Sequence, residues 1–74
     1  MAFVLVNAEL GKDGEVLTAL KEIEEVSDAY LVYGVYDIIV ITKQVDTMKN
    51  LKEIVLNKIR RTENVRSTRA MISV

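Results

Sequence analysis

The stretch "YLVYGVYDIIV", residues 30–40, is apolar except for Gly34 and Asp37. It lies within two runs rich in β-branched and aromatic residues, "DAYLVYG" (28–34) and "YDIIVITK" (36–43). Such runs are typical of β-strands, and the Gly34–Val35 junction between them predicts an antiparallel hairpin. Strand packing alone does not explain a glycine and a carboxylate in the most hydrophobic segment, so both residues need a reason of their own.

The sequence before this hairpin predicts one strand and one helix. "AFVLVNA" (2–8) has apolar residues on both of its alternating sets, which is typical of a strand covered on both faces. "EVLTALKEIEEV" (15–26) has the period of an amphipathic helix, and Asp13 is its expected N-terminal cap. The expected buried residues of this helix are Val16, Leu20 and Ile23, with Leu17 beside them.

The sequence after the hairpin predicts a second helix and a last strand. "VDTMKNLKEIVLNKIRR" (45–61) is amphipathic, with Asp46 or Thr47 as the expected cap. "TENV" (62–65) predicts a short loop, and "RSTRAMISV" (66–74) predicts a strand. The expected buried face of the second helix is Met48, Leu51, Val55 and Ile59.

This order of elements predicts an α+β fold, the ferredoxin-like βαββαβ sandwich, over a single domain of residues 1–74. Its four-stranded antiparallel sheet carries both helices on one face. The first strand has Phe3 and Leu5 on one face and Val4, Val6 and Ala8 on the other, so it offers apolar residues to both sides of the sheet, of which helices cover only one. A chain of 74 residues without cysteine has a marginal core. We therefore expect the second face of the sheet to be used for dimerisation.

The composition excludes several kinds of active site. The chain has no histidine and no cysteine, which removes catalytic triads, thiolate chemistry, disulfides and the commonest zinc sites. We expect no catalytic residue, no metal and no cofactor. A net charge of −1 gives no basic field for a phosphate backbone, so direct DNA binding is not expected. The apolar start is too short for a membrane span and has no basic leader, which indicates a cytoplasmic protein.

Gly34 and Asp37 are candidates for a site that binds a zwitterion. Glycine permits a positive φ, so that neighbouring amides can face a carboxylate, and Asp37 can accept hydrogen bonds from an ammonium group. The alternative is structural: Gly34 serves only the hairpin, and Asp37 caps the turn or pairs with Arg66 or Arg69. The hydroxyls and arginines of "RSTRA" (66–70) form a second candidate cluster, with a solvated strand entrance as its alternative.

Two patterns in the chain resemble one protein family. Val32–Ile39 has the pattern V-x-G-x-Y-D followed by two hydrophobic residues, and Val65–Thr68 has the pattern V-x-x-T. In this order of strands and helices they resemble the effector-binding domain of the Lrp/AsnC (leucine-responsive and asparagine-responsive) regulators. That domain is also called the RAM domain, for regulation of amino acid metabolism. The resemblance spans nearly the whole chain and implies a non-enzymatic domain that binds a small effector, usually an amino acid.

The resemblance also implies partners. Domains of this family dimerise through their sheets, dimers associate into rings such as octamers or decamers, and the effector binds between subunits. Full-length members have an N-terminal helix-turn-helix domain, whereas this chain begins at the first strand. We therefore expect a stand-alone module that co-assembles with full-length Lrp/AsnC regulators or with an enzyme of amino acid metabolism.

The binding site is likewise implied residue by residue. Asp37 is the implied ammonium partner, the backbone of Gly34–Tyr36 orients the ligand, and two hydroxyls supply further donors. Tyr33 and Arg69 are weaker candidates. The implied ligand-binding residues are Gly34, Val35, Tyr36, Asp37, Ser67 and Thr68.

Two other functions fit the same fold. Dimeric α/β barrels built from ferredoxin-like units include small cofactorless oxygenases, although this chain lacks the histidine that often moves protons in them. A ligand-free assembly module is the second alternative. An enclosed hydrophobic cavity would favour the oxygenase, polar groups converging at Asp37 and Thr68 would favour the sensor, and neither would favour the assembly module.

Overall fold

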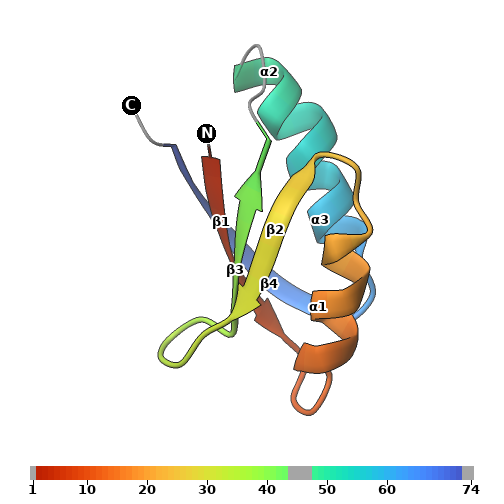
Figure 1. Ribbon diagram of the computed structural model, residues 1–74, viewed down its shortest axis with the longest axis vertical. Coiled ribbons are helices and arrows are strands. Elements are labelled where there is room, and N and C mark those ends of the chain that lie inside the picture. The colour runs from red at the N-terminus through yellow and green to blue at the C-terminus, as the bar shows by residue number, and fades with distance from the viewer. Residues whose placement is uncertain (1, 44–47, 73–74) are drawn as a thin grey trace.

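The computed structural model describes residues 2–43 and 48–72. The helical segments α2, η1 and α3 follow one another without a break and form one helical stretch, in which η1 is π-helical (Figure 1). The elements in chain order are β1 (Ala2–Ala8), α1 (Asp13–Lys21), β2 (Val26–Leu31), β3 (Ile38–Thr42), α2 (Met48–Asn50), η1 (Leu51–Leu56), α3 (Asn57–Arg61) and β4 (Val65–Ile72).

The four strands form one sheet in the order β2-β3-β1-β4. Every neighbouring pair is antiparallel. Because β1 and β2 lie on either side of β3, each helical stretch crosses over the sheet, and both helical stretches cover the same face (Figure 1). The ferredoxin-like sandwich predicted from the sequence is therefore confirmed.

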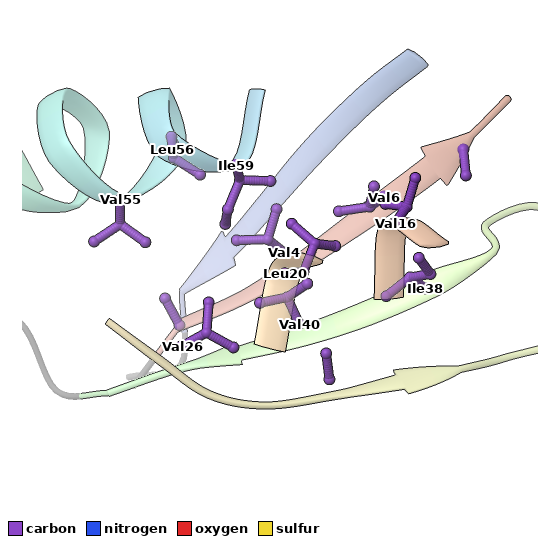
Figure 2. Close-up of a cluster of buried hydrophobic side chains, with 13 residues drawn as sticks. Val4, Val6, Val16, Leu20, Val26, Ile38, Val40, Val55, Leu56 and Ile59 are labelled. Carbon is purple, nitrogen blue, oxygen red and sulfur yellow. The ribbon is translucent and has the colours of Figure 1, made fainter. Parts of the chain in front are cut away.

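The core lies between this covered face and the helices. Val4 and Val6 of β1 are fully buried, as expected of alternate residues on one face of a strand. Figure 2 shows them facing side chains from both helical stretches. Each such side chain contributes roughly 1.5–3 kcal/mol when it is fully buried. The fully buried helical residues are Val16, Leu20, Val55 and Ile59, and the partly buried ones packed against the core are Leu17 and Ile23.

The other face of the sheet is apolar along its central strands. The register places Phe3 beside Ile41 and Met71, and Leu5 beside Ile39, all on the face without helices. Phe3 and Leu5 are half-buried, and Met71 is exposed. A half-buried apolar sheet face of this kind is typical of a surface that packs against another protein.

The β2 edge of this uncovered face is polar. The Tyr30 hydroxyl donates a 2.7 Å hydrogen bond to one carboxylate oxygen of Asp28, and the Ala29 amide donates to the other at 2.8 Å. The Tyr30 hydrogen bond, followed by that of the amide, lowers the pKa of Asp28 below its ordinary value. The same side-chain hydrogen bond raises the pKa of Tyr30. Both groups therefore keep their usual charge states at neutral pH.

α1 differs from the predicted helix at both ends. Asp13 is its first residue, Lys12 is at the N-cap position and no side chain caps the helix, so the predicted Asp13 cap is wrong. Asp13 and Glu15 nevertheless place negative charge in the first turn, where the helix dipole favours it. α1 ends at Lys21, and Val26, predicted as helical, instead pairs with Thr42 in the sheet.

The connection between β2 and β3 is longer than the predicted Gly34–Val35 junction. The loop covers residues 32–37 and is closed by a hydrogen bond from the Val32 amide to the Asp37 carbonyl at 2.9 Å. The Asp37 amide donates to the Val6 carbonyl at 3.1 Å. β3 begins at Ile38, directly after this contact with β1.

Two of the four residues predicted for the buried face of the second helical stretch are confirmed as buried. Val55 and Ile59 are buried in the core. The side chains of Met48 and Leu51, and the candidate caps Asp46 and Thr47, lie outside the residues that the structure describes.

β4 begins at Val65, one residue before its predicted start, and contains a β-bulge. Asn7 pairs with Ser67 but Ala8 pairs with Val65, so Arg66 is the extra residue. A bulge redirects the side chain of its extra residue. Arg66 therefore departs from the regular alternation that places Thr68 on the helix side of the sheet.

Two segments on the helical side of the sheet carry opposite charges: α1 with the turn that follows it, and the second helical stretch. Residues 13–25 contain five acids and one lysine, a net charge of −4, whereas residues 48–61 contain five bases and one glutamate, a net charge of +4. A Lys58–Glu25 ion pair at 2.8 Å joins these two segments. The hydrogen bond from Lys58 is the largest cause that lowers the pKa of Glu25.

Candidate functional site

Two connections and one strand end lie at the same end of the sheet: the β1–α1 turn, the β2–β3 loop and the start of β4 (Figure 1). A cleft of about 660 Å³ lies among them, a volume within the usual range for small-ligand sites. Its lining includes Asn7, Glu9, Val35, Asp37, Arg66 and Ser67.

Asp37 is the most firmly placed residue of this cleft. Its Oδ2 accepts a hydrogen bond from the Ala8 amide at 2.9 Å. This contact agrees with part of the structural alternative, in which Asp37 serves the turn. The other oxygen, Oδ1, has no hydrogen-bond partner among the described residues. Asp37 is only partly buried, so one oxygen positions the loop while the other is free to accept a hydrogen bond from a ligand.

The loop residues before Asp37 occupy different surroundings. Val35 lines the cleft and is 85% exposed. Gly34 has φ +133°, a conformation that side-chain-bearing residues rarely adopt, and no atom lies close to where its Cβ would be. Tyr36 is half-buried and Tyr33 is fully exposed, and neither is part of the cleft lining. Of the predicted loop residues, the structure thus brings Val35 and Asp37 into one cleft.

Ser67 and Thr68 point to opposite faces of the sheet, as successive strand residues do. Ser67 lines the cleft, and its Oγ accepts a 3.2 Å hydrogen bond from the Asn7 side-chain amide. Thr68 Oγ1 instead accepts a 3.2 Å hydrogen bond from Arg60 Nε on the helix side. The two hydroxyls that the sequence analysis grouped together are therefore separated by the strand.

The arginine of the cleft is Arg66, for which the sequence suggested a pairing with Asp37. Arg66 Nε lies 3.9 Å from Glu9 Oε1, with the two side chains 62% and 56% exposed. Such an exposed pair contributes little to stability. No ion pair joins Asp37 to Arg66 or Arg69 in the part of the chain that the structure describes.

Sequence reasoning missed Asn7 and Glu9 as cleft residues. The available signal was the change from apolar to polar residues at the end of "AFVLVNAE". A strand end that turns polar beside a predicted loop is where a site is expected in this kind of fold.

Over residues 2–43 and 48–72, no group of three or more His, Cys, Asp or Glu side chains is arranged to hold a metal ion. Within the same residues, no helix is long and apolar enough to cross a membrane.

Comparisons with known proteins identify the family and support the fold of this chain. The family model of the Lrp/AsnC ligand binding domain matches residues 1–74. A search of curated proteins gave no match. Among solved structures, the chain is 40% identical to FFRP-DM1, covering 99% of this chain and 96% of that one, with a TM-score of 0.87. It is also 40% identical to hypothetical protein PHS023 from Pyrococcus horikoshii, covering 99% and 87%, with a TM-score of 0.85.

A third similar structure contains an amino acid. It is a feast or famine regulatory protein from M. tuberculosis complexed with L-methionine, 28% identical, with a TM-score of 0.73. The match covers 99% of this chain and 50% of that protein. Because the family model matches from the first residue to the last, the chain belongs to the family of Lrp/AsnC ligand-binding domains.

Proposed function

We propose that this chain is an amino-acid-sensing module of the Lrp/AsnC regulator type, with its effector in the cleft at the end of the sheet. The cleft lining carries the proposal: it combines the unpartnered Asp37 Oδ1 with the Arg66 guanidinium. An acceptor and a cation in one cleft complement the ammonium and carboxylate groups of a free amino acid. The relative complexed with L-methionine supports an amino acid as the effector class.

The cleft residues have separate roles in this proposal. Asp37 accepts from the ammonium group, Arg66 or the amides of Gly34–Tyr36 face the carboxylate, and Ser67 adds a hydroxyl. Val35 contacts the effector side chain. Thr68 lies behind the strand, and any part it takes in effector binding is indirect.

We further propose that the module works as a homo-oligomer. The uncovered sheet face, with Phe3, Leu5, Ile39 and Ile41 half-buried, supports dimerisation through the sheets. Dimers then assemble into a ring such as an octamer or decamer. In the cytoplasm, this ring co-assembles with full-length Lrp/AsnC regulators. An effector shifts such an assembly only by binding one of its states more tightly than the other.

An oxygenase is the weaker alternative. Its substrate requires an enclosed apolar cavity, whereas the cleft described above is lined largely by polar side chains at the strand ends. Membership of a family of regulatory ligand-binding domains also points away from an enzyme.

A thermal-unfolding scan against each of the twenty amino acids at millimolar concentration tests the sensor. A ligand at a hundredfold its Kd stabilises the native state by about 2.7 kcal/mol, which is several degrees for a domain of this size. We expect a selective rise in Tm for one or a few amino acids. The rise should disappear in Asp37→Asn, which keeps an acceptor for the Ala8 amide, and persist in Glu22→Gln, which removes an exposed carboxylate outside the cleft. A flat panel for the wild-type oligomer would favour the ligand-free assembly module.

A further inference from the structure

The uncovered face of the sheet carries opposite charges at its two edges. The strand register arranges the side chains of this face in rows that cross all four strands. One row is Tyr30, Ile39, Leu5 and Arg69, and the next is Asp28, Ile41, Phe3 and Met71. Because β2 and β4 are the outer strands, Asp28 lies at one edge of the face and Arg69 at the other, with apolar side chains between them.

Arg69 has no partner for its charge in the part of the chain that the structure describes. It is exposed, and its side chain makes no hydrogen bond or ion pair with residues 2–43 or 48–72. The strand of Arg69 is separated from that of Asp28 by two others, which places the two edges about 14 Å apart. The two charges are therefore too far apart to pair within one molecule.

Asp28 can accept further hydrogen bonds. Its carboxylate accepts one bond on each oxygen, from the Tyr30 hydroxyl at 2.7 Å and from the Ala29 amide at 2.8 Å. A carboxylate has about four acceptor positions, so both oxygens still have room for another donor. An arginine guanidinium matches such a pair of oxygens well.

Two-fold symmetry decides which edges can meet when two copies of this face pack together. The same patch of each copy then contacts the other copy. If the axis crosses the strands, β2 lies over β2 and β4 over β4, which brings like charges together at a cost in free energy. If the axis runs along the strands, β2 of each copy lies over β4 of the other. Each residue then keeps its level along the strand, so the partner's Arg69 lies over the row of Tyr30, next to Asp28.

We propose that two copies of this chain pack sheet against sheet with the two-fold axis along the strands, and that Arg69 of each copy binds the Asp28–Tyr30 pair of the other. The inference rests on the homo-oligomer proposed above and adds the orientation of its subunits. Facing sheets lie about 10 Å apart, a gap that arginine and tyrosine side chains from opposite sheets can span. Symmetry forms the pair twice, at both edges of an apolar centre that contains Phe3 and Leu5.

The test is a charge reversal measured by sedimentation equilibrium of the whole chain. Asp28→Arg and Arg69→Asp each place like charges at both edges, so each should weaken self-association by about tenfold or more. An equimolar mixture of the two variants has opposite charges at both edges again, and mixed dimers should form with an affinity near that of wild type. The control is Arg61→Asp, which reverses an exposed charge on the helical side and should stay within about twofold of wild type.

The outcomes separate this pairing from the homo-oligomer itself. Wild-type protein that stays monomeric would overturn both. A wild-type dimer that both reversals leave within about twofold would overturn the pairing alone, as would variants that are folded by circular dichroism but do not associate when mixed. If a reversed variant does not fold, Arg69→Gln removes the charge without reversing it, and an unchanged Kd in this variant would contradict the pairing. Asp28 and Arg69 lie outside the lining of the amino acid cleft, so its ligand response is tested independently.

Discussion

The Asp37 carboxylate accepts a 2.9 Å hydrogen bond from the backbone amide of Ala8, a residue 29 positions earlier in the chain. This bond fixes the β2–β3 loop to the end of β1. The same residue thus forms one wall of the cleft and presents its second carboxylate oxygen to the cleft. Structural and binding roles of Asp37 are therefore combined in one side chain, and substitutions can separate them.

Two substitutions of Asp37 should differ in their effect on the free energy of unfolding. Asp37→Ala leaves the partly buried Ala8 amide without its acceptor and should lower the free energy of unfolding by about 1–2 kcal/mol. Asp37→Asn keeps a side-chain oxygen in place and should change it by less than about 0.5 kcal/mol. Urea unfolding of both variants measures the difference. Equal losses in the two variants would mean that the charge, and not the hydrogen bond, stabilises the loop.

The core should depend strongly on Ile59. Ile59 is fully buried, so Ile59→Ala removes three carbon atoms from the centre of the packing and should cost about 2–5 kcal/mol in denaturant unfolding. Leu10→Ala is the control, because Leu10 is 97% exposed and its truncation should stay within about 0.5 kcal/mol of wild type. Similar effects of the two substitutions would contradict the described packing of α3 on the sheet.

Substitution of the loop glycine, Gly34, should lower the stability of the fold through its backbone conformation alone. Gly34 has φ +133° and open space around it, so Gly34→Ala creates no clash with other residues but should cost about 1–3 kcal/mol through backbone strain. Gly14 lies in α1 with equally open surroundings. Gly14→Ala should instead stabilise the protein by up to about 1 kcal/mol. Thermal unfolding of this pair compares the same chemical change at a left-handed and a helical position.

The Lys58–Glu25 pair predicts a dependence of stability on acid pH. The pKa of Glu25 is lowered in the folded protein, chiefly by the hydrogen bond from Lys58. A carboxyl with a lowered folded pKa contributes stability above its unfolded pKa, and this contribution is lost as pH falls through the folded pKa. Lys58→Gln should therefore be less stable than wild type at neutral pH, with the difference shrinking in acid.

Urea unfolding between neutral pH and pH about 3 measures this difference across the range in which carboxylates titrate. The control is Lys49→Gln, which removes the same charge from the same helical stretch but not from the Lys58–Glu25 pair. Its stability relative to wild type should not show this dependence on pH. A pH-independent gap between Lys58→Gln and wild type would show that Lys58 acts through packing and not through the ion pair.

The fold followed from sequence because its patterns are local and strong. The β1 run is apolar on both of its alternating sets, as in a strand covered on both faces, and Val16 and Leu20 recur with the period of a helix. Boundaries were less predictable: Val26 fits the period of α1, but its pairing with Thr42 in the sheet prevails. The length of the β2–β3 loop could not be predicted from the sequence either. Asp37 at the end of this loop is held by hydrogen bonds to β1, which is distant in the chain.

The candidate site was less predictable than the fold. Family patterns identified Val35, Asp37 and Ser67, which the structure brings together in one cleft. Strand alternation already places Ser67 and Thr68 on opposite faces. The sequence could not show that a bulge redirects Arg66, because the bulge depends on the β1–β4 register. Pairing between strands far apart in the chain is not encoded in any single pattern.

The opposite charges of the two helical stretches have a consequence for the behaviour of the protein in solution. A chain with a net charge of −1 is expected to show weak mutual repulsion, but the charges of −4 on residues 13–25 and +4 on residues 48–61 are separated on its surface. At low ionic strength, the acidic segment of one molecule attracts the basic segment of another. Salt screens this attraction beyond about 8 Å at 0.15 M. The second virial coefficient measured by light scattering should therefore rise as salt is added.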